Sequence, residues 1–188
     1  MKALFPRHSL LIGSSAVLAG VLALAGCNDK ATHADEKSAV TTSLNSANLS
    51  AVSVSQDRDK GVMTLKGDVT TDDQKSQAES LARQAAPDYT VANEIGVRPP
   101  GDGQAGSVAS NRDSAIEDNY KASLKENKAL NDQSISYSSK NGTLVLTGSV
   151  KTTQQKREAE KLAKGIQNVQ QVVNEIEVKP GKHSTAAS

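Results

Sequence analysis

Aromatic residues and cysteine are scarce in this chain of 188 residues. Tryptophan is absent, and the aromatic residues are Phe5, Tyr89, Tyr120 and Tyr137. Cys27 is the only cysteine, so no disulfide can form within one chain. The hydrophobic cores must therefore be aliphatic and compact, with little room for a deep ligand cavity.

Histidine is equally scarce, and none falls where catalysis would need it. His8 lies near the N-terminus, His33 precedes the first predicted helix and His183 lies in the C-terminal tail. The sequence contains no nucleophile paired with a base, and no set of metal ligands, at a recognisable spacing. Acidic pairs such as Asp72 and Asp73 occur at a predicted helix start, where they stabilise the helix dipole. We expect no enzymatic activity, no cofactor and no bound metal.

The first 26 residues have the organisation of a secretory signal peptide. Lys2 and Arg7 precede an apolar run from Leu10 to Ala25. The run ends in Leu24-Ala25-Gly26-Cys27, which resembles the lipobox of bacterial lipoproteins. That resemblance implies cleavage before Cys27, diacylglycerol on its sulfur and an acylated amine of the palmitate type. An ordinary signal peptide, or an uncleaved helix with an incidental cysteine, is the alternative, although the run is short for a transmembrane span.

The residues after Cys27 bear on location. In lipoprotein sorting, an aspartate directly after the cysteine retains the protein in the inner membrane, and Asn28 occupies that place here. The outer membrane is therefore favoured, while Asp29 leaves the inner membrane open. Residues 27–34 are expected to form a lipidated polar tether.

A nine-residue phrase occurs twice, at 61–69 and at 142–150, and both copies read G-x-x-x-L-x-G-x-V. At the same offset of 81 residues, 17 of the 39 positions in 61–99 are identical to those in 142–180. Such agreement indicates two repeated units. We place them at 35–99 and 112–180, with a flexible linker at 100–111 and a disordered tail at 181–188.

Each unit reads as helix, strand, strand, helix and strand. The predicted fold class is therefore α+β, with two tandem small domains, each a three-stranded mixed sheet packed against two helices. In the second unit, the helical spacing of Ile116, Tyr120 and Leu124 predicts that these residues form the buried face of its first helix.

Six residues of the repeat are predicted to be structural. Gly61 and Gly142 precede the second strand of each unit, and Asn141-Gly142 is a strong hairpin signal. Gly67 and Gly148 lie on the buried face, where a missing side chain lets a helix approach or marks a bulge. Asn93 and Asn174 stand in apolar strand faces, where their amides need hydrogen-bond partners.

These features together resemble the BON domain. They are the glycine before the second strand, Leu-x-Gly-x-Val, an alanine-rich helix and Val-x-Asn-x-Ile-x-Val, present in both units. The layout resembles dual-BON outer-membrane lipoproteins, with osmotically inducible periplasmic BON proteins as unlipidated relatives. The resemblance implies a non-enzymatic module that binds phospholipid and maintains the envelope under stress. BON domains usually carry Gly-Val before the last strand, whereas this chain has Pro87-Asp88 and Asn168-Val169. Since asparagine tolerates the left-handed region, only the second copy is expected to keep that turn.

The two halves differ in charge. Residues 35–98 hold seven basic and ten acidic residues, net −3, and residues 112–182 hold twelve basic and nine acidic, net +3. Such asymmetry indicates a membrane or polyanion partner. Helical spacing places Arg157, Lys161 and Lys164, here called the basic face, opposite the apolar stripe of their helix. Their counterparts 81 positions earlier, in the same order, are Ser76, Ser80 and Arg83, and further charge is supplied nearby by Lys151 and Lys156.

The sequence predicts an envelope lipoprotein on the periplasmic face of the outer membrane, attached through Cys27. Its second domain would bind anionic phospholipid headgroups through the basic face, with Lys156 and Lys151 adding charge; an ordinary solvated face is the plain alternative. A periplasmic stress chaperone or adaptor with envelope protein partners is a second hypothesis, and it requires a contiguous exposed apolar patch. A module that senses a small cation is a third. No nucleic-acid partner is expected.

Overall fold

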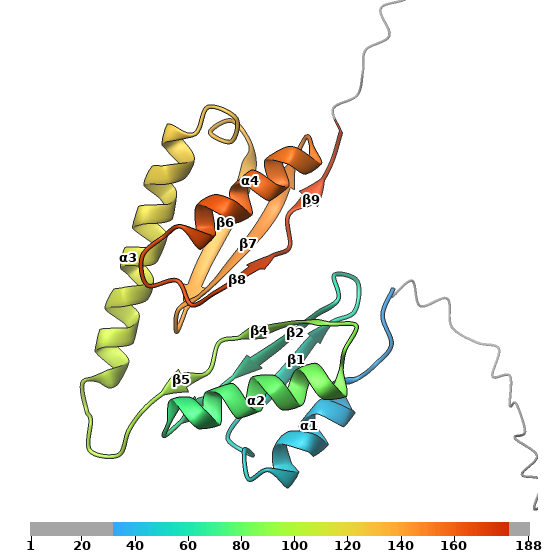
Figure 1. The fold of residues 1–188 in the computed structure, drawn as a ribbon, viewed down its shortest axis with the longest axis vertical. Coiled ribbons are helices and arrows are strands. Elements are labelled where there is room, and N and C mark those ends of the chain that lie inside the picture. The colour runs from blue at the N-terminus through green and yellow to red at the C-terminus, as the bar shows by residue number, and fades with distance from the viewer. Residues whose placement is uncertain (1–31, 181–188) are drawn as a thin grey trace, which may run out of the picture.

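The computed structural model describes residues 32–180 (Figure 1). The predictions for the signal peptide, for Cys27 and for the tail after residue 180 lie outside these residues. The first unit contains α1 (Lys37–Ser46), β1 (Ser53–Asp57), β2 (Val62–Lys66), β3 (Asp68–Val69), α2 (Asp72–Ala85), β4 (Thr90–Asn93) and β5 (Gly96–Val97). The second contains α3 (Ala105–Glu126), β6 (Ser134–Lys140), β7 (Thr143–Val150), α4 (Thr153–Lys164), β8 (Gln171–Asn174) and β9 (Glu177–Val178).

The predicted α+β architecture is confirmed in both units. In the first, β2 pairs antiparallel with β1 and parallel with β4. In the second, β7 pairs in the same way with β6 and β8. The last predicted strand of each unit is divided in two. In the first unit β4 is followed by β5, which pairs with β3, and in the second β8 is followed by β9, which pairs with the end of β7. Two helices cover one face of the mixed sheet in each unit (Figure 1). The mixed sheet of the first unit has the predicted three strands, whereas β9 extends the sheet of the second unit to four.

Each unit has its own hydrophobic core. In the first, the stripe of α1 is buried at Val40 and Leu44, against Met63 and Leu65 of β2. Both cores depart from the aliphatic expectation, because Tyr89 is buried in the first and the ring of Tyr120 is fully buried on α3 in the second. The hydroxyl of Tyr120 donates to the Ala159 carbonyl at 3.1 Å, which satisfies the one polar atom that this side chain brings inside.

The repeated glycines occupy left-handed backbone positions. Gly67 has a φ of +129° and Gly148 a φ of +100°, and a Cβ at either would collide with the backbone carbonyl of Ala51 or Ser134. The close approach is thus made by the backbone at or just before the start of the preceding strand, and not by a helix. Both glycines are exposed, so the prediction that they lie on the buried face is wrong. The Asn141-Gly142 hairpin is confirmed, with φ of 49° and 83° at its two positions.

The turn before the last strand differs between the copies, as predicted. Asn168 has a φ of 69°, in the left-handed region that glycine usually fills. Neither Pro87 nor Asp88 has a positive φ. The first copy therefore reaches β4 through a different turn.

The connection between the units is helical over much of its length, and this corrects the flexible linker predicted at 100–111. Residues 105–111 form the first turns of α3, whose start is fixed by Asp102. Oδ1 of Asp102 accepts hydrogen bonds from the N–H groups of Gln104 and Ala105 at 2.9 and 3.0 Å. Because α3 also contacts β5, one continuous helix spans both units (Figure 1).

The end of the predicted tether is also ordered. Oγ1 of Thr32 donates to the carbonyl of Asp59 at 3.0 Å, and the N–H of His33 donates to that of Arg58 at 3.2 Å. The hydroxyl of Tyr89 donates to the carbonyl of Ala34 at 2.5 Å. Residues 32–34 are therefore held against the first unit and do not belong to a free tether.

The two units pack through the sheet faces that their helices leave uncovered. A small apolar cluster between them contains Val62, Ala92, Val145 and Val173. Ala92 and Val173 are counterparts at the 81-residue offset, so equivalent surfaces meet. The arrangement is an approximate two-fold pairing of the repeats.

Candidate functional site

The predicted lipid-binding residues lie on α4, whose start is fixed by a capping box. Oγ1 of Thr152 accepts from the Gln155 N–H at 3.1 Å, and Oε1 of Gln155 accepts from the Thr152 N–H at 3.0 Å. Ala159 and Ala163 are fully buried against the sheet. Small residues on the inner face hold α4 close to the core and leave its outer face to solvent.

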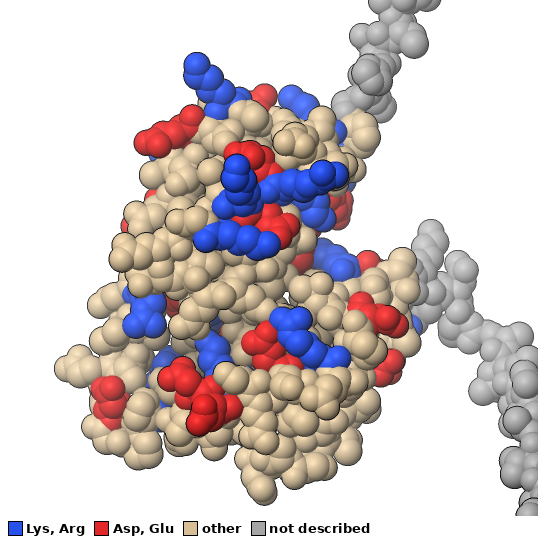
Figure 2. All heavy atoms as spheres, in the orientation of Figure 1, with Lys and Arg blue, Asp and Glu red and all other residues tan. Residues whose placement is uncertain are grey.

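The basic face is exposed on that outer side. Arg157, Lys161 and Lys164 line a shallow surface hollow together with Glu160. Figure 2 shows lysine and arginine side chains gathered over α4, with acidic side chains between them. The structure thus places the three predicted residues together and adds an acidic group among them.

The three basic residues are not equivalent. Nζ of Lys164 lies 2.6 Å from Oε1 of Glu160. Arg83, the counterpart of Lys164 in α2, makes the same contact with Glu79 at 2.7 Å. Within residues 32–180, Arg157 and Lys161 have no ionic partner. At the three basic-face positions, α4 therefore differs from α2 through Arg157 and Lys161, where α2 has serines.

The two additional basic residues contribute unequally. Nζ of Lys151 lies 3.5 Å from a carboxylate oxygen of Asp132, so part of its charge is balanced. Lys156 is half-buried beside the basic face. Lys161 and Lys164 lie in the last turn of α4, where cations also favour the helix dipole.

Asn93 and Asn174 hold the second helix of each unit to its sheet. Nδ2 of Asn174 donates to the carbonyl of Lys156 at 3.1 Å and to Glu160 at 3.2 Å. Oδ1 of Asn174 accepts from the Ile176 N–H at 3.2 Å, which turns the chain between β8 and β9. Asn93 makes the equivalent three contacts in the first unit. Each asparagine thus interrupts the last strand and holds a helix.

Hydrogen bonding sets the protonation of the two glutamates that these asparagines contact. The bond from Lys164 and then that from Asn174 hold the pKa of Glu160 below its ordinary value. At Glu79, burial raises the pKa, but bonds from Asn93 and Arg83 outweigh it, so the pKa is again lowered. Both glutamates are therefore ionised at neutral pH, and Glu160 reduces the positive charge of the basic face.

Sequence reasoning missed a buried carboxylate in α3. Asp113 is 7% exposed, and its oxygens accept from the N–H groups of Asn141 and Gly142 at 2.8 and 2.9 Å. It also accepts from the hydroxyl of Ser139 at 2.9 Å. Asp113 lies three residues before Ile116 on the buried stripe, and that spacing could have revealed its role in holding the hairpin turn.

Contacts between the units were also missed, because they join distant residues. Nζ of Lys75 on α2 donates to the carbonyl of Asn141 at 3.0 Å and to Gln170 at 3.2 Å. Burial lowers the pKa of Lys75 below its ordinary value. A partly buried ammonium that crosses between the units fixes their relative position.

The distribution of acidic and histidine side chains bears on the cation hypothesis. No group of three or more His, Cys, Asp or Glu residues that could hold a metal ion occurs within residues 32–180. Over the same span, no helix is long and apolar enough to cross a bilayer.

Comparison with known proteins adds a family match. The family model described as BON domain matches residues 34–99 and 112–180. Osmotically-inducible protein Y of Escherichia coli (strain K12) is 26% identical over 149 residues, which cover 77% of this chain and 73% of that protein.

Similarity to solved structures is low. Two structures of CdsD, a structural protein of the type III secretion system of Chlamydia trachomatis, match with TM-scores of 0.30 and 0.28. Their identities to this chain are 17% and 18%. The matches cover 76% and 82% of this chain and 61% and 68% of the CdsD chains.

Proposed function

This chain belongs to the BON-domain family, and from that premise we propose that it is an envelope lipoprotein whose second domain binds anionic phospholipid through α4. The observation that carries the proposal is the contrast on the outer face between two helices that occupy equivalent places in their units. Arg157 and Lys161 are exposed and have no ionic partner within the described chain, whereas their counterparts Ser76 and Ser80 are uncharged. The serines of α2 show that these positions do not need a charged side chain when the helix face only contacts solvent.

The electrostatic free energy that the basic face can contribute is in the range of a weak surface attachment. A basic residue near an anionic leaflet contributes about 1 kcal/mol. Arg157 and Lys161 supply two such contributions, and Lys164 adds less because Glu160 balances it. The alanine-lined inner face of α4 and the absence of any aromatic residue on it favour contact with headgroups over deep insertion.

The proposed anchor makes weak contacts sufficient. If Cys27 carries the acyl chains, four residues separate it from Thr32, where the chain is held on the first domain, and the five Cα–Cα steps between them reach roughly 17 Å at full extension. That short reach keeps the domains at a high effective concentration beside the bilayer. With the proposed anchor in place, the contacts of Thr32–Ala34 would keep the first domain close to the membrane surface.

The chaperone or adaptor hypothesis receives less support. It requires a contiguous exposed apolar patch, because unfolded or partner segments bind through such surface. Between residues 32 and 180, the large hydrophobic residues that are well exposed are Val108 on α3 and Val178 on β9. Two residues on different elements do not make a patch of that kind.

Vesicle co-sedimentation tests the phospholipid proposal. Residues 28–188, which retain the whole described fold without the cysteine, are mixed with vesicles of phosphatidylcholine alone or with phosphatidylglycerol added. We expect binding that rises with the anionic fraction and falls with added salt. Equal sedimentation with both vesicle types would remove the electrostatic mechanism.

The anchor is tested separately in cells. Radiolabelled palmitate should enter the wild-type protein and not the Cys27→Ala variant, and only the wild type should fractionate with membranes. Identical labelling and fractionation of the two proteins would overturn the anchor and leave the vesicle result standing.

A further inference from the structure

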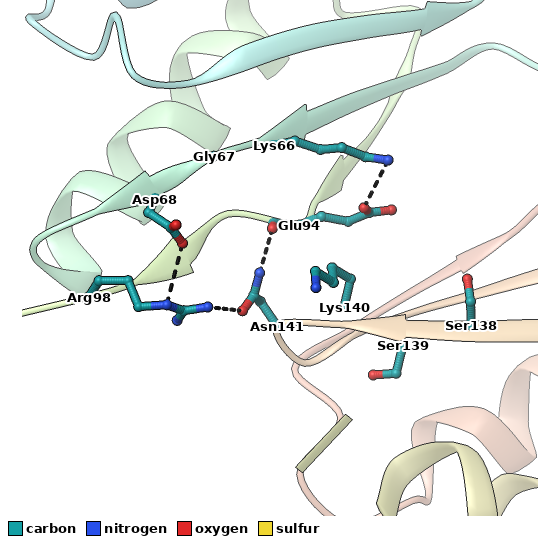
Figure 3. A pocket seen from close by; sticks show the side chains of 9 residues that line it. All are labelled: Lys66, Gly67, Asp68, Glu94, Arg98, Ser138, Ser139, Lys140 and Asn141. Atoms are coloured by element: carbon teal, nitrogen blue, oxygen red, sulfur yellow. Dashed lines mark hydrogen bonds and ion pairs between the residues drawn. The ribbon is translucent and has the colours of Figure 1, made fainter. Parts of the chain in front are cut away.

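A hollow of about 430 Å³ lies between the two domains (Figure 3). Its basic residues come from both sides, with Lys66 and Arg98 in the first domain and Lys140 at the end of β6 in the second. The remaining lining consists of Gly67, Asp68, Glu94, Ser138, Ser139 and Asn141. Apart from Gly67, each of these residues carries a polar or charged side chain, and the hollow lies outside both hydrophobic cores.

The repeat provides an internal comparison that explains why this space is open. On the opposite side of the approximate two-fold, Nζ of Lys60 crosses between the domains and lies 2.8 Å from Oε2 of Glu175. The counterparts of these residues are Asn141 and Glu94. Asn141 is shorter than lysine, and its Nδ2 reaches only the backbone carbonyl of Glu94, at 2.8 Å. No ammonium crosses to the Glu94 carboxylate from the second domain, so the space stays unfilled.

The charges around the hollow are only loosely paired. Nζ of Lys66 lies 3.4 Å from Oε2 of Glu94, and Nε of Arg98 lies 3.5 Å from Oδ1 of Asp68. Nη2 of Arg98 also donates to Oδ1 of Asn141, at 3.3 Å. Both ion-pair separations exceed the 2.8 Å of the Lys60 and Glu175 pair. Long, partly exposed pairs contribute little and exchange readily with other partners.

Among the three basic residues that line the hollow, Lys140 is the one without a partner in the described chain. It is exposed, and within residues 32–180 it makes no ion pair or side-chain hydrogen bond. In Figure 3 its side chain is drawn beside Glu94 and Asn141, which line the same hollow, with no interaction drawn to either. The hollow therefore contains three basic and two acidic side chains, with one positive charge in excess.

We propose that this inter-domain hollow binds a small phosphate-bearing anion, with Lys140 as its principal contact and Lys66 and Arg98 beside it. A phosphate group offers several acceptor oxygens and up to two negative charges, so it can accept from an ammonium, a guanidinium and the hydroxyl of Ser138 together. The polar lining disfavours an acyl chain. The ligand is thus a free phosphate ester or the headgroup of a lipid, and the site is independent of the α4 surface.

The test uses residues 28–188, which keep both domains, and isothermal titration with inorganic phosphate and with glycerol phosphate. We expect saturable binding that Lys140→Gln weakens about tenfold, since one charge-assisted hydrogen bond is lost. Ser138→Glu, which keeps Lys140 and adds a carboxylate to the lining, should weaken it as well. Lys179→Gln is the matched control, because Lys179 is the counterpart of Arg98 and does not line the hollow.

The outcomes separate this site from α4. No saturable binding, or equal weakening by Lys140→Gln and Lys179→Gln, overturns the proposal. Loss of phosphate binding in an Arg157→Ser, Lys161→Ser variant with Lys140→Gln unaffected also overturns it and assigns the anion to α4. Displacement of phosphate by short-chain phosphatidylglycerol supports a headgroup as the ligand, and persistence of phosphate in its presence supports a free ester.

Discussion

The side-chain amide of Gln171 lies against the outer edge of β4, where its Oε1 accepts a hydrogen bond from the N–H of Asn93 at 2.9 Å. Nε2 of the same amide donates to the carbonyl of Val91 at 2.8 Å. One glutamine of the second domain thus supplies the acceptor and the donor that a neighbouring strand would offer. Since edge strands carry unpaired backbone groups, this contact closes an edge and joins the domains.

Gln171→Ala should lower the free energy of unfolding by about 1–3 kcal/mol, because it leaves the half-buried N–H of Asn93 without its partner. Urea unfolding and amide hydrogen exchange at Asn93 measure the effect. Gln154→Ala, at an exposed position of α4, is the control and should leave both unchanged. Unaltered exchange at Asn93 in the Gln171 variant would mean that the contact does not protect the edge.

Acid should destabilise the protein partly through Glu160. Its pKa is held below the unfolded value of about 4.3 by the bonds from Lys164 and Asn174, so its stabilisation is present above that value. The stabilisation is lost as pH falls through the lower, folded pKa. Glu160→Gln should therefore show a shallower fall of melting temperature with acidification than the wild type. Superimposable curves for the two proteins would contradict the assignment.

The helical connection predicts that breaking α3 releases the domains. Ser110→Pro at an exposed position removes a helix hydrogen bond and should cost the helix about 3 kcal/mol or more. Small-angle X-ray scattering should then report a larger radius of gyration, while Ser110→Ala should match the wild type. If the proline variant scatters like the wild type, the interface alone fixes the arrangement.

The strand order, the buried faces of the helices and the hairpin were predictable because local hydrophobic periodicity and turn residues determine them. The 81-residue repeat doubled each of these signals, so Asn93 and Asn174 could be recognised as a pair. The start of α3 was missed because its first turns contain Gly106 and two serines, a composition typical of linkers. Packing against β5 stabilises those turns, and no local pattern reports that contact.

The candidate sites were predictable only in part. Helical spacing brought Arg157, Lys161 and Lys164 to one face, yet the partial neutralisation of Lys164 depends on the rotamer of Glu160. The inter-domain hollow could not be predicted from the sequence, because Lys66 and Lys140 come together only through the packing of two sheets. Charge counts per domain cannot reveal an excess cation that arises between domains.

The most direct test of the α4 surface compares two charge-matched variants in the same vesicle assay. Arg157→Ser with Lys161→Ser gives α4 the residues of α2, and Lys121→Ser with Lys125→Ser removes the same charge from exposed positions of α3. We predict about a thirtyfold loss of affinity for phosphatidylglycerol vesicles in the α4 variant, at about 1 kcal/mol for each residue, and near wild-type binding in the α3 variant. Equal losses in the two variants would contradict the account, because binding would then follow net charge and not the exposed face of α4.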